Sequence, residues 1–139
     1  MDTLIQNASL LHGHLGPYLV LGLKAGLAAV ETLGRDPFTM KAVVLTGGSP
    51  PSSCFIDGVQ VATGCTLGKG NIDTRIGEGV SALFMKGESM FEVKVRRTVL
   101  NEICEKLSNG MEDELALEIA ERRYGELFET RCDRPLSKS

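Results

Sequence analysis

Apolar residues recur at helical spacing near the start of the chain. The pattern predicts a helix that begins at Asp2, whose carboxylate can cap it, and that ends near His12 and Gly13. A second helix is predicted from Pro17, which suits a first helical turn because it lacks an N–H, to Gly34. The apolar positions are Leu4, Ile5, Ala8 and Leu11 in the first segment and Leu19, Val20, Leu23, Leu27 and Val30 in the second.

The middle of the chain changes to strand patterns separated by turns. Short apolar runs and alternating residues indicate strands, and clusters of Gly, Pro and Ser indicate the loops between them. In chain order we predict a strand at 40–46, a loop at 47–53, a helix at 54–64 with Ser53 as its N-cap, and strands at 74–76, 80–86 and 90–96.

Helical spacing returns after residue 98, where Leu115, Ile119 and Tyr124 continue an apolar stripe. Helices at both ends with strands between them predict an α+β fold, in which a mainly antiparallel sheet has N-terminal and C-terminal helices packed on it. No repeat or linker divides residues 1–139, so we expect a single domain.

The composition excludes several classes of function. The net charge is −3, from 15 Lys and Arg against 18 Asp and Glu, so we expect no nucleic-acid partner. No apolar run approaches the roughly 20 residues of a spanning helix and the N-terminus lacks signal-peptide features, so we expect no membrane partner and a cytoplasmic location. In a reducing compartment the four cysteines favour metal or redox chemistry over structural disulfides.

His12 and His14 are the only two histidines of the chain, and one glycine separates them. In a loop, side chains two residues apart can converge on one point, whereas in a helix they diverge by about 200°. Gly13 between them, and Gly16 and Pro17 after them, favour a loop. Imidazole is the commonest ligand for zinc, nickel or iron, so the pair is a candidate metal site. The alternative is that both histidines cap the end of the first helix.

Cys54 and Cys65 lie near the two ends of the third predicted helix. Cys54 is in its first turn, where the helix dipole stabilises a thiolate and lowers its pKa, so it is a candidate metal ligand and catalytic thiol. Eleven residues of straight helix separate the two sulfurs by about 16 Å, so they cannot share one metal, and Cys65 can be a buried structural residue. Asp57 is a candidate catalytic base or ligand-orienting residue, or a carboxylate that only answers the helix dipole.

The turn TLGKGN at residues 66–71 differs from a phosphate-binding loop. Such a loop follows a strand and has Ser or Thr after its lysine, whereas here a helix precedes the turn and Gly70 follows Lys69. We therefore reject nucleotide binding through this turn. The turn can present Lys69 and Asn71 to an anion, and the alternative is tight-turn geometry alone.

Two stretches, HGHLGPYLVLGLKAG and CFIDGVQVATGCTLGKGNI, together resemble the core domain of the formylmethanofuran dehydrogenase FmdE family. The resemblance spans residues 9–97, which leaves 98–130 as a helical C-terminal extension. It implies an α+β core, often dimeric, with one site formed by the histidine loop and the cysteine helix. The site residues that it implies are His12, His14, Cys54, Asp57, Gln60, Cys65, Thr66 and Lys69, of which Gln60, Cys65, Thr66 and Lys69 are expected to bind a cofactor.

The chain departs from the family pattern at two places. Many members have a cysteine where Gly16 stands, so the thiol role of that position passes to Cys54 or Cys65. Many members also carry a four-cysteine zinc finger, but Cys132 is alone in the C-terminal segment. The chain therefore resembles a short form of the family without that module.

Two classes of function remain open. The first is a small metal-dependent enzyme or metal carrier, with His12, His14 and Cys54 as ligands of a divalent transition metal and an open position for water or a small-molecule substrate. Zinc is favoured, with nickel and iron as alternatives. The second is a non-catalytic accessory or cofactor-binding subunit of a molybdenum or tungsten oxidoreductase.

Excess apolar surface predicts a homodimer. The second helix is apolar on more faces than a small sheet can cover, and the strand pair between residues 80 and 95 has an edge that must be covered or paired. A two-fold dimer is the commonest solution to both requirements.

Overall fold

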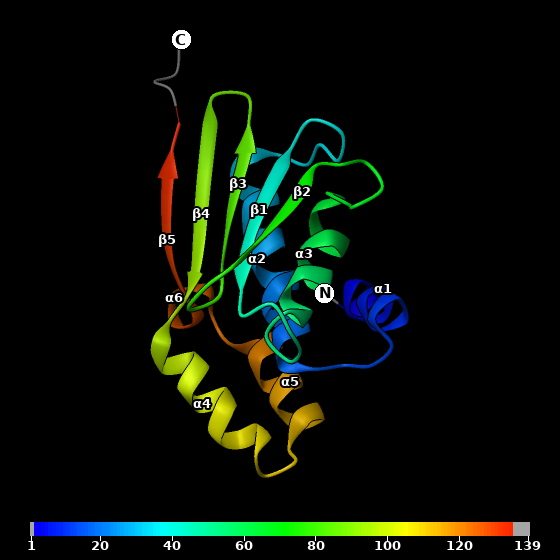
Figure 1. The fold of residues 1–139 in the computed structure, drawn as a ribbon, viewed down its shortest axis with the longest axis vertical. Helices are drawn as coiled ribbons and strands as arrows, with labels where there is room; N and C mark the ends of the chain where they lie inside the picture. The colour runs from blue at the N-terminus through cyan, green and yellow to red at the C-terminus, as the bar shows by residue number, and fades with distance from the viewer. Residues whose placement is uncertain (1, 135–139) are drawn as a thin grey trace.

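The computed structural model describes residues 2–134 (Figure 1). Its helices are α1 (Asp2–His12), α2 (Pro17–Leu33), α3 (Cys54–Thr63), α4 (Arg97–Leu107), α5 (Glu112–Glu121) and α6 (Tyr124–Leu127). Its strands are β1 (Lys41–Thr46), β2 (Ile72–Ile76), β3 (Ser81–Lys86), β4 (Ser89–Val95) and β5 (Phe128–Asp133). The three N-terminal helices and the four strands predicted from the sequence are all present, and β2 begins earlier than expected.

The strands form one sheet in the order β2-β1-β3-β4-β5. The β1–β2 pair is parallel, and the other neighbouring pairs are antiparallel. The parallel pair arises because α3 connects β1 to β2 as a crossover helix, which brings the chain back in the same direction. This arrangement confirms the predicted α+β fold with a mainly antiparallel sheet.

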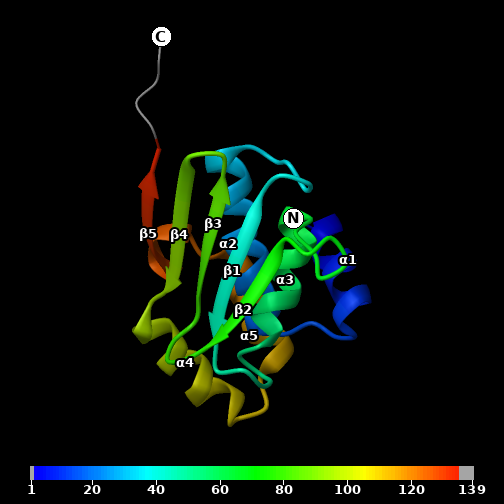
Figure 2. The same cartoon turned by 45° about the horizontal axis from the view of Figure 1, so that its top comes forward.

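Helices α2 and α3 cover one face of the sheet, and α2 lies at the centre of the molecule (Figures 1 and 2). Leu19, Leu21 and Leu23, on several sides of α2, are all fully buried. The expectation that α2 leaves apolar faces uncovered is therefore wrong, because α1, α3, α5 and the sheet all pack on it. The exposed edge expected of the strand pair is also covered, by β1 on one side and β5 on the other.

Glycines bring α2 and α3 together backbone to backbone. A Cβ atom on Gly22 would overlap the carbonyl oxygen of Phe55, and one on Gly58 would overlap that of Leu19. Only glycine permits this approach, which fixes the N-terminal end of α3 beside the start of α2. The contact therefore positions Cys54 next to the residues that follow the histidine loop.

The beginning of α3 differs from the sequence expectation. Ser53 has helical backbone angles, φ −66° and ψ −15°, and its side chain makes no capping hydrogen bond. The predicted N-cap is therefore wrong, because the chain already turns before α3, where the N–H of Ser53 donates to the carbonyl of Ser49. No helix within residues 2–134 is long and apolar enough to cross a membrane.

The C-terminal segment packs on α2 and then joins the sheet. The ammonium group of Lys24, which is only 5% exposed, donates to the carbonyls of Ile119, Ala120 and Arg122 and so holds the end of α5 against α2. The helical extension expected over 98–130 is helical in α4, α5 and α6, but its last residues form β5, antiparallel to β4. Within β5 only Phe128 is buried, so the rest of this edge strand is exposed.

Candidate functional site

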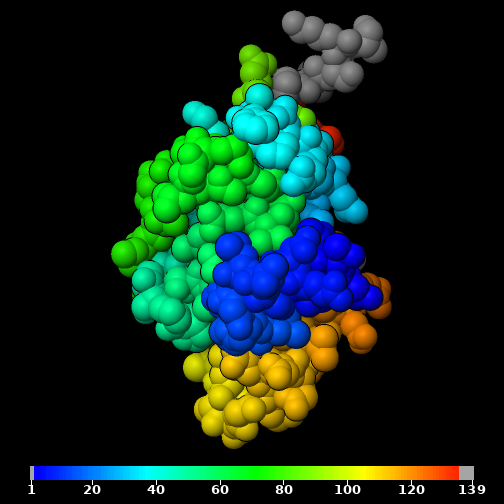
Figure 3. Space-filling model, turned by 90° about the vertical axis from the view of Figure 1, so that its right-hand side faces the viewer, coloured from blue at the N-terminus to red at the C-terminus, as the bar shows by residue number. Residues whose placement is uncertain are grey.

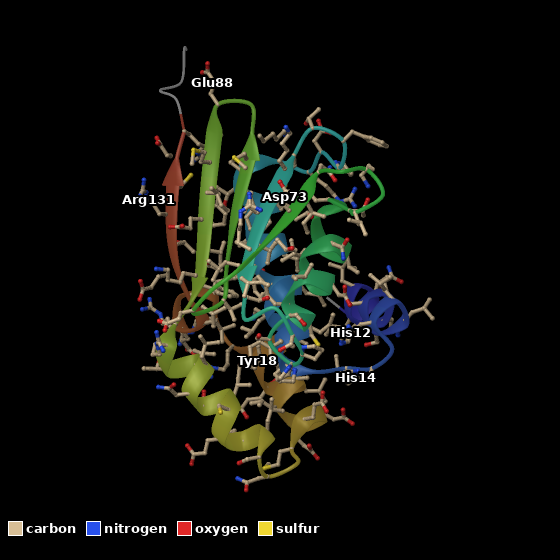
Figure 4. The ribbon with its side chains drawn as sticks, viewed as in Figure 1. His12, His14, Tyr18, Asp73, Glu88 and Arg131 are labelled. Atoms are coloured by element: carbon tan, nitrogen blue, oxygen red, sulfur yellow. The ribbon has the colours of Figure 1, made fainter. Side chains whose placement is uncertain are left out.

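The two histidines meet at the end of α1, as the loop hypothesis requires. His12 is the last residue of α1, and Gly13 turns the chain with a φ of 106°, a value that favours glycine. The imidazole rings of His12 and His14 are tilted toward each other, with their centroids 4.9 Å apart (Figure 4). The glycine between them therefore produces the convergence expected from the sequence.

His12 is held by a carboxylate from α3. Its Nδ1 donates to Oδ2 of Asp57 over 2.6 Å, and its side chain is 12% exposed. Because a carboxylate only accepts hydrogen bonds, Nδ1 carries the hydrogen, and Nε2 is the ring atom that presents a lone pair to a ligand. That Nε2 atom is buried and has no hydrogen-bond partner among the described residues.

The second carboxylate oxygen of Asp57, Oδ1, also accepts a hydrogen bond. Gln60 donates from Nε2 to Oδ1 of Asp57 over 3.3 Å, and Oε1 of Gln60 accepts from the N–H of Leu67 over 3.2 Å. Since both Asp57 oxygens are engaged, the carboxylate orients His12, one of the roles expected for it. Gln60, anchored to the turn that follows α3, supports that carboxylate in turn.

A small cavity lies between the histidine loop, α3 and the start of α5. It has a volume of about 20 Å³, which is room for one water molecule or one ion. In Figure 3 the histidine loop (blue) meets the segment before α3 (teal) and the α4–α5 region (yellow to orange) on this side of the molecule. The lining residues are His12, His14, Gly16, Pro17, Tyr18, Leu19, Pro51, Cys54, Leu107 and Glu112.

All three predicted metal ligands therefore line one cavity. His12 lines it from the end of α1, His14 from the loop that follows, and Cys54 from the first turn of α3. The two sequence stretches converge at this point, as expected. Within residues 2–134, however, no three His, Cys, Asp or Glu side chains are grouped in an arrangement that holds a metal ion.

Glu112 is a site residue that was not predicted from the sequence. It begins α5, and its Oε1 pairs with Nε2 of His14 over 2.7 Å. A Cβ atom on Gly16 would lie 2.9 Å from the same Oε1, so this carboxylate fills the space of a side chain at position 16. No local signal marks Glu112, because 98 residues separate it from His14.

The electrostatics of Cys54 contradict the sequence expectation. Burial raises the pKa of its thiol, and the negative charges of Asp57 and Glu112 raise it further. A backbone hydrogen bond lowers the pKa but does not offset these effects. The expected activation by the helix N-terminus is therefore wrong for this arrangement, because two carboxylates oppose the formation of a third negative charge.

The other predicted cofactor-binding residues lie at the opposite end of α3. Cys65 is buried, and its thiol donates to the carbonyl of Met40 over 3.4 Å. Lys69 donates from Nζ to Oγ1 of Thr66 over 3.0 Å and lies over the ring of Phe38. These residues do not line the histidine cavity. The histidine-containing and cysteine-containing stretches of the sequence therefore meet only where each begins, at the histidine loop and at Cys54.

Asn71 holds this second region in place. Its amide donates to the carbonyls of Pro37 and Met40, and its Oδ1 accepts from the N–H of Thr66. This set of bonds accounts for Asn71 as a turn-closing residue, which was the alternative to anion contact. The cofactor-binding role expected of Thr66 and Lys69 stays a prediction.

Comparison with known proteins adds three findings. The family model described as FmdE, molybdenum formylmethanofuran dehydrogenase operon, matches residues 11–138. A probable S-adenosyl-L-methionine-binding protein of Archaeoglobus fulgidus is 38% identical over 74 residues, which are 52% of this chain and 20% of that protein. The chain thus spans about a fifth of the length of this curated relative.

A solved structure shares the fold. The crystal structure of a tungsten formylmethanofuran dehydrogenase FmdE-like protein from Syntrophus aciditrophicus is similar, with a TM-score of 0.68. The similarity covers 99% of this chain and 76% of the other, at 17% sequence identity. At that identity the likeness concerns the fold alone.

Proposed function

The chain belongs to the FmdE family, and from this premise we propose that it binds one divalent transition-metal ion at the histidine cavity. The proposed ligands are His12, His14 and Cys54, and zinc is favoured over nickel and iron. One observation carries the proposal: Nε2 of His12 is buried without a hydrogen-bond partner in the described chain, while Nδ1 donates to Asp57. A buried polar atom without a partner costs free energy, and a carboxylate behind the ring is the usual support of a metal-ligating histidine.

The donor set agrees with this class of metal. Two imidazoles and one thiolate suit zinc, and the cavity of about 20 Å³ accommodates one ion. Nε2 of His14 is bonded to Glu112, so ligation through that atom requires the pair to separate. A bound cation would also favour the thiolate of Cys54, because it offsets the charges of Asp57 and Glu112 that raise the thiol pKa.

With His12, His14 and Cys54 as ligands, a zinc ion would keep one further position, and there it would supply Lewis-acid polarisation of a small molecule. Around that position the residues of this chain have separate roles. Asp57 accepts from His12 at Oδ2 and from Gln60 at Oδ1, so we assign it the role of positioning His12. Glu112, once released from His14, is the carboxylate at the cavity that can hold a proton.

The size of the cavity also supports the accessory role as a second candidate function. A volume of about 20 Å³ holds no organic substrate, and the family description refers to a molybdenum formylmethanofuran dehydrogenase operon. A non-catalytic subunit of a larger oxidoreductase that carries a structural metal fits both observations. The ligand named for the Archaeoglobus relative is not carried over, because four fifths of that protein lie outside the match.

We propose a cytoplasmic location in both cases. All four cysteines are free, and a thiolate metal ligand requires a compartment that keeps thiols reduced.

Metal analysis of the purified protein tests the proposal. We expect about one ion per chain, lost in His12→Ala and in Cys54→Ser. Cys132→Ser is the matched control, because Cys132 is exposed on β5 and should leave the metal content unchanged. Metal-free wild-type protein that also takes up no added zinc would contradict the proposal.

Cobalt(II) substitution gives a second readout that does not depend on activity. Thiolate ligation produces a sulfur-to-cobalt charge-transfer band in the near ultraviolet, which Cys54→Ser should remove and Cys132→Ser should retain. Affinity purification from the native host separates the two candidate functions. A stoichiometric molybdenum or tungsten oxidoreductase in the eluate supports the accessory role, and its absence supports the metal-dependent enzyme.

A further inference from the structure

A second cavity lies beside the histidine cavity. Its volume is about 200 Å³, against about 20 Å³ for the histidine cavity. An apolar cavity of about 150 Å³ is already large enough to bind benzene, so the second cavity has room for a ring-sized organic group. Besides Tyr18, the residues that line it are Gly47, Ser52, Gly77, Gly79, Val80 and Leu100.

The second cavity lies at the carboxyl ends of the parallel strands β1 and β2. Gly47 directly follows β1, which ends at Thr46, and Gly77 directly follows β2, which ends at Ile76. Where a helix connects parallel strands, the carboxyl ends of those strands are a common location of ligand sites. Both glycines are exposed, so the second cavity opens to solvent and a ligand can enter it from outside.

Tyr18 lines both cavities. It lies in the first turn of α2, and Figure 4 shows it below the sheet, next to His12 and His14. Helix α4 also borders both cavities, because Leu100 lines the second cavity and Leu107, about two turns later on the same face, lines the histidine cavity. The two cavities are therefore adjacent at Tyr18.

The hydroxyl of Tyr18 is available to a ligand. The residue is only 9% exposed, and its hydroxyl makes no hydrogen bond within residues 2–134. In that part of the chain, Nε2 of His12 is the only fully buried side-chain nitrogen or oxygen without a partner, so the Tyr18 oxygen reaches accessible surface at the cavities. Burial raises the pKa of Tyr18 and Cys104 raises it further, so the hydroxyl keeps its hydrogen and can donate it.

The rest of the lining is uncharged, which determines the kind of group that fits. Val80 and Leu100 present apolar side chains. The hydroxyl of Ser52 is already engaged, because it accepts from the N–H of Gly47 over 3.3 Å and donates to the carbonyl of Ser49 over 3.3 Å. The lining therefore suits an uncharged group that has apolar surface and one hydrogen-bond acceptor for Tyr18.

We propose that the second cavity binds the uncharged, ring-sized body of a small organic substrate, and that Tyr18 donates a hydrogen bond to it. The head group of the same molecule enters the histidine cavity, and this part rests on the proposed metal site. The histidine cavity alone is too small for an organic substrate, and the second cavity provides the space beside it. Tyr18 is then a substrate-contacting residue, which favours the metal-dependent enzyme over the accessory subunit.

Tyrosine fluorescence tests the site directly. The chain has two tyrosines and no tryptophan, so Tyr124→Phe leaves Tyr18 as the sole fluorophore and Tyr18→Phe leaves Tyr124. The probe is cyclohexanecarboxamide, which is ring-sized, uncharged and transparent to the exciting light, and which lacks a strong metal-ligating group. In metal-free protein this amide should change the emission of Tyr124→Phe saturably and leave the emission of Tyr18→Phe unchanged.

Saturation-transfer NMR measures the affinity of the amide in each protein. Tyr18→Phe keeps the ring but loses the donor, so it should bind the amide about three- to tenfold more weakly than the wild type does. Tyr124→Phe is the matched control, because it removes a hydroxyl from α6, which lines neither cavity, and its affinity should be unchanged. Circular dichroism establishes that both variants are folded.

Cobalt(II)-loaded protein tests the connection between the two cavities. Cyclohexanecarbohydroxamate adds a metal-ligating head group to the same ring, and acetohydroxamate has that head group without the ring. The ring-bearing hydroxamate should bind at least about tenfold more tightly, because its ring is buried in the second cavity. The visible absorption of the cobalt ion measures both affinities.

Three outcomes would overturn the proposal. The amide leaves the Tyr18 emission unchanged up to its solubility limit, or it binds Tyr18→Phe as tightly as the wild type, or the two hydroxamates bind with equal affinity. Failure of the proposed metal site gives a different result. Protein that takes up no metal but binds the amide in a Tyr18-dependent manner would support the second cavity as a ligand site and contradict only the metal site.

Discussion

The imidazole of His12 donates its Nδ1 hydrogen to Oδ2 of Asp57 over 2.6 Å, across 45 residues of sequence. This contact joins the last residue of α1 to the first turns of α3. It also fixes which nitrogen of His12 presents a lone pair, since the carboxylate can only accept. The buried Nε2 atom is therefore oriented before any ligand arrives.

Replacement of Asp57 by asparagine should weaken metal binding by about 10- to 100-fold without abolishing it, because the ring loses its charged support but keeps its ligating atom. Competition with a chromophoric chelator measures the affinity. Asp73→Asn, an exposed aspartate on β2, is the control. An unchanged affinity for the Asp57 variant would show that His12 needs no positioning by this carboxylate.

Cys54 should be the slowest of the three accessible cysteines to alkylate in metal-free protein. Burial and two carboxylates raise the pKa of its thiol, so the reactive thiolate forms only at higher pH than in an exposed cysteine. Mass-spectrometric labelling at increasing pH measures the midpoint for Cys54 against Cys104 and Cys132, which are exposed internal controls. A midpoint for Cys54 below theirs would contradict the assignment.

The same raised pKa has a consequence for stability. The folded protein retains the Cys54 proton to a higher pH than the unfolded chain does. This group therefore makes unfolding easier as the pH rises above the ordinary thiol pKa, and it contributes no pH dependence well below that value. Urea denaturation of wild type and Cys54→Ser at increasing pH should show the smaller alkaline loss of stability in the variant.

Neutralisation of Glu112 should accelerate the alkylation of Cys54. The charge of Glu112 is one of the causes that raise the Cys54 pKa, so Glu112→Gln lowers it and increases the thiolate fraction at a given pH. Glu114→Gln, on the same helix and exposed, is the matched control and should leave the rate unchanged. Slower labelling in Glu112→Gln would indicate that Glu112 acts on Cys54 through structure instead of charge.

Gly58→Ala should destabilise the fold by about 3 kcal/mol or more, because the added methyl overlaps the backbone oxygen of Leu19, which cannot move independently of α2. Urea denaturation followed by circular dichroism measures the free energy of unfolding. Gly125→Ala is the control, since a Cβ there meets nothing within 4 Å. Equal stability of the two variants would mean that α2 and α3 separate without cost.

Much of the fold follows from local sequence. Pro17 and Gly34 bound α2 as predicted, and the apolar spacing of α1 identifies that helix. These features depend on residues a few positions apart, which is the range that backbone preferences and helical periodicity describe. β5 was missed because an exposed edge strand with one buried residue, Phe128, lacks the alternation that marks a strand.

The candidate site also has residues that the sequence predicts and one that it does not. His12, His14, Cys54 and Asp57 are recognisable from residue type and spacing, because Gly13 and the start of α3 constrain them locally. Sequence alone determined which groups are available for chemistry here. Tertiary structure alone decided that Glu112 joins them and that the Cys54 pKa rises, because burial and the charges of distant carboxylates depend on distances in space that spacing along the chain does not contain.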